Sequence, residues 1–556
     1  MRGRAVRLTT HSAYRIVALL AMCALLAGCQ VPGPTTPEGT FNLDFSKINA
    51  ERADGAIVFM VDGVSASVFQ QMLEAGELPN IRKYFVDRGL FAPRAVCNIP
   101  SVTLANETSI ATGLYPGHHG ITGINWFDRN RLIWRDYETI AQKNTLDGDY
   151  TAATIFEHLA DRTTMSLFFQ PHRGTTKFVE NWMSAGPPFF FGWYEFVDRL
   201  TLFRFHVLID IARQRREFPA VTVAYLLAPD FRAYASGVES PQYRQAIRHT
   251  DAQLGRVLAD LDGAGLLDRL YVAIVSDHSL TEVKQHFHVG EFLKTQVGLD
   301  VADKKLWEET SFRDRISAYQ KHSCVLYGSG DRYSAICLRK PIRQPGQVVG
   351  YQPWPVRPAP DDLRAYPTRD GEVDLPAVLI EQEAVDAVAY AVGPDAVRVV
   401  RKSGQVEFRQ DGGPGAPVRY TLIDGADPLG WSGKVSADML EGKPASPHDW
   451  LAETVDTEFP GLPAQMVAYF RSRLAGDLCV FAAPEWDFNN RNRAGHGGLR
   501  PEDMCTPLLL VGPGVPHKRI DVAQTVDLVP TLLHLLGRSV PPGLDGQILV
   551  PRTMAR

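Results

Sequence analysis

Five residues of the chain form a set of candidate metal ligands. Three aspartates each come shortly after an apolar run, one histidine adjoins the last of them, and another lies between two glycines: Asp62, Asp230, Asp277, His278 and His496. Carboxylate oxygens and imidazole nitrogens are hard to borderline ligands that suit Zn²⁺. Two such ions about 4 Å apart can bind the attacking and the leaving oxygen of an in-line displacement at phosphorus. The residue types therefore indicate metal-assisted chemistry.

A second segment that could take part in a reaction begins with a hydroxyl side chain. Residues 103–120 start with a helical pattern at Thr103 and end at a glycine. Free backbone N–H groups and the helix dipole favour a bound phosphate at a helix N-terminus, which is where Thr103 stands. Cations bound nearby would lower the pKa of its hydroxyl.

Buried strands are expected to position these residues. Four short runs are continuously apolar, which is typical of strands buried on both faces: 57–61, 221–227, 270–275 and 507–511. Helix-like stretches such as Gln242–Leu261 lie between them, so we expect an open, mostly parallel sheet. In such sheets the site lies beyond the carboxyl ends of the strands.

The segment from Thr103 to Gly120 resembles the nucleophile segment of the type I phosphodiesterase/nucleotide pyrophosphatase family, within the alkaline phosphatase superfamily. The pattern of that family is a threonine, an asparagine three residues later, then TG-L-Y-P and HG. The matching residues are Thr103, Asn106, Thr112–Pro116 and His119–Gly120. The resemblance implies an α/β fold: an alkaline-phosphatase-like core with a mostly parallel central sheet flanked by helices, plus a β-containing insertion.

The resemblance extends over about residues 53–290 and 477–546 and implies a role for each matched residue. Thr103 is the nucleophile, which forms a covalent phosphothreonine that metal-activated water releases. One metal is held by Asp62, Asp277, His278 and the Thr103 oxygen. A second is held by Asp230, a histidine four residues later and His496. Asn125, one residue off the family spacing, is carried over as a substrate-binding residue that contacts the phosphate.

The chain departs from the family pattern at position 234, where the second metal's histidine is replaced by Tyr234. A neutral phenol with a pKa of about 10 is a poorer ligand than imidazole, although a cation could deprotonate it. Three hypotheses stay open: the second site binds metal weakly, is completed by a residue such as His286 or His288, or is vacant. We therefore expect one or two Zn²⁺ ions as cofactor, or other divalent metals.

The N-terminal residues predict export and lipid attachment. Arginines precede an apolar run, Ile16–Leu26, that has the length of a signal-peptide core. The following Leu26–Cys29 resembles the bacterial lipoprotein box, in which the cysteine is lipidated. We expect a lipoprotein signal peptide over 1–28, lipidation of Cys29 and a tether over 29–50. The protein would then be an exported lipoprotein, anchored to a membrane of the bacterial cell envelope.

Composition and the positions of turn-forming residues indicate how the rest of the chain is divided. The 556 residues are 45% hydrophobic and carry a net charge of −5, which excludes a disordered protein and gives no support to nucleic-acid binding. Proline and glycine cluster over 341–360, and a hairpin-like alternation spans Val397–Phe408. We expect a catalytic core over 51–324 and 471–556, and an insertion subdomain over 325–470.

These features together predict a metal-dependent hydrolase of phosphate esters, of the phosphodiesterase/nucleotide pyrophosphatase type, acting on a small-molecule or lipid phosphate ester. Leu104 stands where nucleotide-specific members place an aromatic residue, so nucleotide preference is not supported. A phosphomonoesterase, a phosphonate hydrolase or a phosphotransferase on the same core is the enzymatic alternative. The non-enzymatic alternative is an envelope binding protein with a degenerate metal site.

Lipid attachment at Cys29 has a direct test. Intact mass spectrometry of the mature protein should find acyl chains on an N-terminal Cys29, and the Cys29→Ser variant should lack this added mass. A mature wild-type chain without lipid mass at Cys29 would contradict the prediction.

Overall fold

The computed structural model describes residues 43–48, 54–139, 142–180, 182–311, 314–345, 347–489 and 491–550. Cys29, the predicted signal peptide and most of the predicted tether lie outside these residues. Within the described ranges, no helix is both long enough and apolar enough to cross a membrane.

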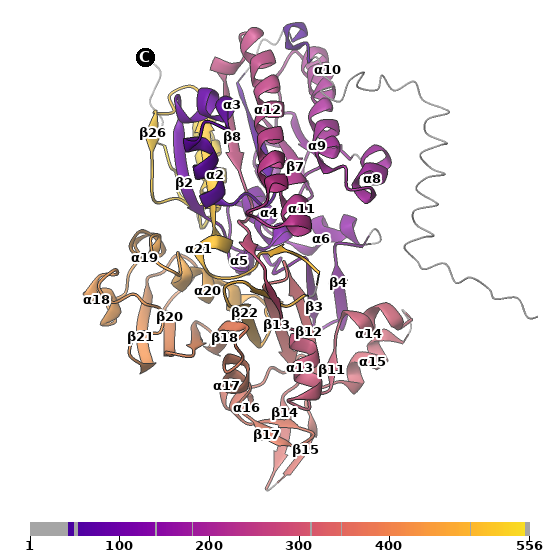
Figure 1. The fold of residues 1–556 in the computed structure, drawn as a ribbon, viewed down its shortest axis with the longest axis vertical. Helices are drawn as coiled ribbons and strands as arrows, with labels where there is room; N and C mark the ends of the chain where they lie inside the picture. Colours follow the sequence, from indigo (N-terminus) through magenta and orange to yellow (C-terminus); the bar gives the residue numbers. More distant parts are fainter. Residues whose placement is uncertain are drawn as a thin grey trace, which may run out of the picture.

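An eight-stranded sheet forms the centre of the upper part of the molecule (Figure 1). Its strands, in spatial order, are β26 (Lys518–Arg519), β2 (Leu90–Val96), β25 (Cys505–Val511), β8 (Leu270–Val275), β1 (Gly55–Val61), β7 (Val221–Leu226), β5 (Thr164–Leu167) and β6 (Lys177–Val179). The pairs from β8 to β6 are parallel, whereas β25 pairs antiparallel with β8 and β2. The predicted mostly parallel central sheet is confirmed, and the four apolar runs form β1, β7, β8 and β25.

Helices cover both faces of this sheet, which explains why its central strands are continuously apolar. On one face, Ile57 and Phe59 of β1 pack in a core with residues of α2 (Ala66–Glu74), α10 (Phe205–Arg215) and α12 (Pro241–Gly263). On the other, Val58 and Met60 pack with α4 (Thr103–Thr112) and α22 (Leu528–Leu535). The helix α12 includes the predicted helix Gln242–Leu261.

A second eight-stranded sheet lies below the first in Figure 1 and is almost entirely antiparallel. In spatial order its strands are β11 (Val301–Ala302), β12 (Cys324–Ser329), β13 (Tyr333–Leu338), β22 (Leu478–Ala482), β18 (Val385–Gly393), β19 (Ala396–Arg401), β20 (Gly404–Gln410) and β21 (Val418–Gly425). The hairpin expected over Val397–Phe408 is β19–β20, with Arg401 opposite Gly404.

The second sheet extends past the boundaries expected for the insertion. Its strand β11 precedes residue 325, and β22 follows residue 470. The strand β22 is central because it pairs with both β13 and β18. The division of the chain at 325 and 470 therefore stays a prediction, while the β content expected between these positions is present.

Candidate active site

Neighbouring strands of the central sheet bring the three aspartates together. Asp62 directly follows β1, and Asp277 comes two residues after the end of β8. Asp230 lies in the first turn of α11 (Ala228–Ser236), which follows β7. Because β7, β1 and β8 are adjacent and parallel, their carboxyl ends meet at the same edge of the sheet. All three carboxylates are almost fully buried.

One group of ligand atoms is formed by Asp62, Asp277 and His278, here called the first ligand group. The Nε2 atom of His278 lies 3.4 Å from Oδ1 of Asp62 and 3.3 Å from Oδ2 of Asp277. Ligand atoms bound about 2.1 Å from one tetrahedral Zn²⁺ lie roughly 3.4 Å from each other. The spacing of the first ligand group therefore fits a single cation.

Hydrogen bonds orient the first ligand group. Tyr225 donates its hydroxyl hydrogen to Oδ2 of Asp62, and the backbone N–H of Gly63 donates to Oδ1 of Asp277 at 3.3 Å. The other oxygen of each carboxylate has no hydrogen-bond donor among the described residues. The Nδ1 atom of His278 lies 3.0 Å from the carbonyl oxygen of Ser279, so the lone pair is on Nε2. Oδ1 of Asp62, Oδ2 of Asp277 and Nε2 of His278 thus face one another with free lone pairs. Such a set can bind a cation.

Thr103 is the first residue of α4 and lies beside this group. Its Oγ1 atom is 3.1 Å from Nε2 of His278. Asn106, one turn later, holds the preceding loop in place: its side chain accepts from the backbone N–H of Asn98 at 2.7 Å and donates to the Pro100 carbonyl at 3.0 Å. The asparagine of the sequence motif therefore shapes the approach to Thr103.

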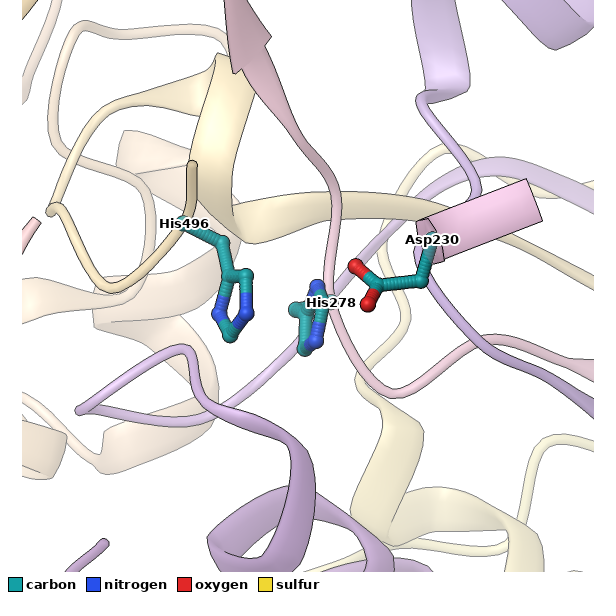
Figure 2. Close-up of side chains that lie close together, drawn as sticks. All are labelled: Asp230, His278 and His496. Atoms are coloured by element: carbon teal, nitrogen blue, oxygen red, sulfur yellow. The ribbon is translucent and has the colours of Figure 1, made fainter. Parts of the chain in front are cut away.

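The second ligand group consists of Asp230, His278 and His496, whose ligand atoms lie within 4.8 Å of one another. Figure 2 shows the His278 and His496 rings face to face, with the Asp230 carboxylate directed toward them. The ring centroids of the two histidines are 3.5 Å apart. Nδ1 of His496 lies 2.7 Å from the Ser101 carbonyl oxygen, to which it donates. Tyr234 is one turn of α11 beyond Asp230, and its hydroxyl oxygen is 2.6 Å from Nε2 of His496.

The turn between β12 and β13 positions His496. The backbone N–H of His496 donates to the carbonyl of Gly330 at 2.8 Å, and that of Arg332 donates to the carbonyl of His496 at 3.0 Å. Gly330 has a φ of 65°, and a Cβ atom there would lie 2.5 Å from Nδ1 of the His496 ring. Arg332 is fully buried and bonds Asp503 at 2.9 Å. The second sheet therefore supplies the support for this histidine.

A close approach also requires glycine at position 63. Gly63 has a φ of 65°, and a Cβ atom there would lie 2.7 Å from the Cβ of Asp230 and 2.8 Å from its Oδ1. Any side chain would push Asp230 out of the second ligand group. In the Asp62-Gly63 pair, Asp62 is a candidate ligand and Gly63 leaves the space that Asp230 occupies.

The remaining candidate residues lie elsewhere. His286 is in β10 (Gln285–His286) and bonds Asp487 at 2.7 Å, and His288 precedes α13 (Val289–Thr295). Neither imidazole belongs to the two ligand groups, so completion of the second site by His286 or His288 is not supported. Asn125 is buried at the start of β3 (Asn125–Asp128), and its phosphate contact stays a prediction.

Burial sets the protonation of the cluster. It raises the pKa of Asp62 to about 6, and it raises the pKa values of Asp230 and Asp277, which also repel one another and Asp62. It lowers the pKa of His278 well below the ordinary value and that of His496 to about 4. The imidazoles are therefore neutral, as metal ligands must be, and the ionised carboxylates need a compensating charge.

Tyr225 is a site residue that sequence reasoning missed. Burial and the nearby Asp62 raise the pKa of its phenol, so it stays a hydrogen-bond donor to that carboxylate. A signal was present, since it is the one polar aromatic residue inside the apolar run that ends before Asp230.

The raised pKa of Asp62 predicts how the stability of the metal-free protein depends on pH. The folded state keeps a proton on Asp62 that the unfolded chain loses near pH 4, so the free energy of unfolding should fall as the pH rises from 4 to 6. The contribution of this group is up to about 3 kcal/mol. In chemical denaturation at a series of pH values, the free energy of unfolding of Asp62→Asn should fall by this amount less than that of the wild type between pH 4 and 6. An equal pH dependence in both proteins would contradict the prediction.

Part of the chain is similar to known proteins. The family model for type I phosphodiesterase/nucleotide pyrophosphatase matches residues 56–349, more than half of the chain. An uncharacterized pyrophosphatase/phosphodiesterase of Schizosaccharomyces pombe is 24% identical over 285 residues, 50% of this chain and 56% of that protein. Ectonucleotide pyrophosphatase/phosphodiesterase 2 of Saccharomyces cerevisiae is 25% identical over 290 residues, 48% of this chain and 51% of that protein. The chain thus spans about half the length of these relatives.

A mouse relative, ectonucleotide pyrophosphatase/phosphodiesterase family member 1, is 23% identical over 269 residues, which cover 48% of this chain and 28% of that protein. The matched family region contains β7, β8 and all of β1 but its first residue, and with them four of the five candidate ligands, together with Thr103. On this evidence the chain belongs to the type I phosphodiesterase/nucleotide pyrophosphatase family.

Proposed function

We propose that this protein is a metal-dependent hydrolase of phosphate esters, with phosphodiesters or pyrophosphates as substrates and Thr103 as the nucleophile. The observation that carries the proposal is the 3.1 Å separation between Oγ1 of Thr103 and Nε2 of His278, at the edge of the first ligand group. The relatives named above as pyrophosphatases/phosphodiesterases support the diester or pyrophosphate class.

Asp62, Asp277 and His278 would hold a divalent cation, for which Zn²⁺ is our candidate from the ligand types. When bound, such an ion lowers the pKa of an adjacent hydroxyl and offsets negative charge on a phosphate. The chain's residues supply the rest of the site. Thr103 is partly exposed at the helix start, where first-turn N–H groups have no partner within the helix and can donate to phosphate oxygens.

The reaction then proceeds in two displacements. Thr103 gives up its hydroxyl proton to solvent, and its oxygen forms a bond to phosphorus as the bond from phosphorus to the ester oxygen breaks. The leaving oxygen departs with that electron pair and takes a proton from solvent, which releases the alcohol or phosphate. Water next attacks the phosphorus of this intermediate from the vacated side, and the bond between phosphorus and the Thr103 oxygen breaks. The phosphate product leaves, and the proton that the water loses restores the Thr103 hydroxyl through solvent. Asn106 fixes the loop that precedes Thr103 through its hydrogen bonds to the backbone of Asn98 and Pro100.

The other parts of the proposal rest on the sequence. They are an N-terminal lipid anchor at Cys29, a location in the bacterial cell envelope, and a catalytic core that an insertion over 325–470 interrupts. A membrane-anchored enzyme would meet small-molecule or lipid phosphate esters at the envelope.

Removal of the nucleophile tests the proposed function. The full chain in detergent with added Zn²⁺ should hydrolyse bis(p-nitrophenyl) phosphate faster than p-nitrophenyl phosphate. Thr103→Ala should lower kcat/KM by about 10³-fold or more, whereas Thr103→Ser, which keeps a hydroxyl, should retain part of the activity. Wild type quenched with acid during turnover of bis(p-nitrophenyl) phosphate should carry a p-nitrophenyl phosphate group on the peptide containing Thr103.

Each outcome separates the candidate functions. Equal rates in wild type and Thr103→Ala would refute a threonine nucleophile. Faster turnover of the monoester would favour the phosphomonoesterase alternative. No turnover of either ester by folded, metal-loaded protein would favour the envelope binding protein.

A further inference from the structure

Tyr234 makes a hydrogen bond to the atom with which His496 would bind a metal. The Nδ1 atom of His496 donates to the Ser101 carbonyl at 2.7 Å, so the ring's lone pair is on Nε2. The hydroxyl oxygen of Tyr234 lies 2.6 Å from this Nε2 and donates its hydrogen to it. The two rings are held together at a centroid distance of 5.9 Å.

The length of this contact distinguishes a hydrogen bond from two ligands of one ion. Two ligand atoms of a tetrahedral Zn²⁺ lie roughly 3.4 Å apart. The contacts of His278 in the first ligand group, at 3.3 and 3.4 Å, have that spacing. The Tyr234–His496 contact at 2.6 Å is far shorter and is an ordinary hydrogen-bond length. The two sites are therefore built differently.

In the part of the chain that the structure describes, no further His, Cys, Asp or Glu side chain replaces the ligand that the second site loses at His496. Among the described His, Cys, Asp and Glu side chains, it contains only Asp230, His278 and His496. His278 is shared with the first ligand group, where its Nε2 faces two carboxylates. With Nε2 of His496 engaged by Tyr234, Asp230 is left as the only ligand that serves the second site alone.

We propose that Tyr234 closes the second metal site, so that the chain binds a single divalent cation at the first ligand group. The Tyr234–His496 hydrogen bond takes the place of the second ion and keeps the His496 ring fixed without a metal. The inference depends on the proposed function only in requiring the first cation, and it makes no use of turnover.

Metal stoichiometry tests the inference directly. Full-length protein in detergent, stripped with a chelator, is titrated with Zn²⁺ by calorimetry, and its metal content is measured after gel filtration. The wild type should bind one tight ion per chain. Tyr234→His, which supplies an imidazole beside Asp230 and frees His496, should bind two. Adding Asp230→Asn to Tyr234→His should return the number to one.

Two further variants serve as controls. Tyr194→His changes another tyrosine that packs on Phe231, as Tyr234 does, but it has no place in either ligand group and should leave one ion bound. Tyr234→Phe removes the hydroxyl without adding a ligand and should also bind one ion tightly. If Tyr234→His fails to fold, as judged by its thermal transition, the wild type and Tyr234→Phe decide the question.

Three results would overturn the inference: two equally tight ions in the wild type, loss of an ion in Tyr234→Phe, or a single ion in well-folded Tyr234→His. Loss in Tyr234→Phe would identify the phenol as a ligand. A wild type that binds no ion would reject the proposed metal-dependent function as well. One bound ion in a protein without hydrolase activity would reject only that function.

Discussion

Three buried carboxylates at adjacent strand ends are the constraint on which this structure depends. Asp62, Asp230 and Asp277 each have one oxygen without a hydrogen-bond donor among the described residues. Burial raises the pKa values of all three carboxyl groups, and the charge of Asp62 raises those of Asp230 and Asp277 further. Burial of ionised carboxylates is strongly unfavourable unless protons or cations offset their charge. Neutral imidazoles beside them make a cation the natural partner, and Thr103 lies where such a cation would act on its hydroxyl.

Both sheets contribute to this arrangement. The central sheet places the aspartates because β7, β1 and β8 are parallel neighbours, and the small size of Gly63 lets Asp230 approach the others. The second sheet places His496 through the turn that contains Gly330 and Arg332. The candidate active site therefore lies where the two sheets meet, and the region after β8 supports it.

The sequence predicted the central sheet because strands buried on both faces leave continuous apolar runs, as in β1 and β8. Four of the candidate ligands closely follow such runs, and His496 was found from its resemblance to a family motif. The hydrogen bond between Tyr234 and His496 was out of reach because the two residues are 262 positions apart and meet only in the folded chain. The place of β22 in the second sheet was likewise out of reach, because this strand pairs with β13 and β18, which are distant from it in sequence.

The most direct test of this account is the position of bound zinc in the folded protein. Anomalous diffraction at the zinc edge, from crystals of the full chain grown with Zn²⁺, should give one strong peak bounded by Asp62, Asp277 and His278. The absence of a peak at that position would contradict the central claim, because the converging lone pairs of this group would then need another explanation.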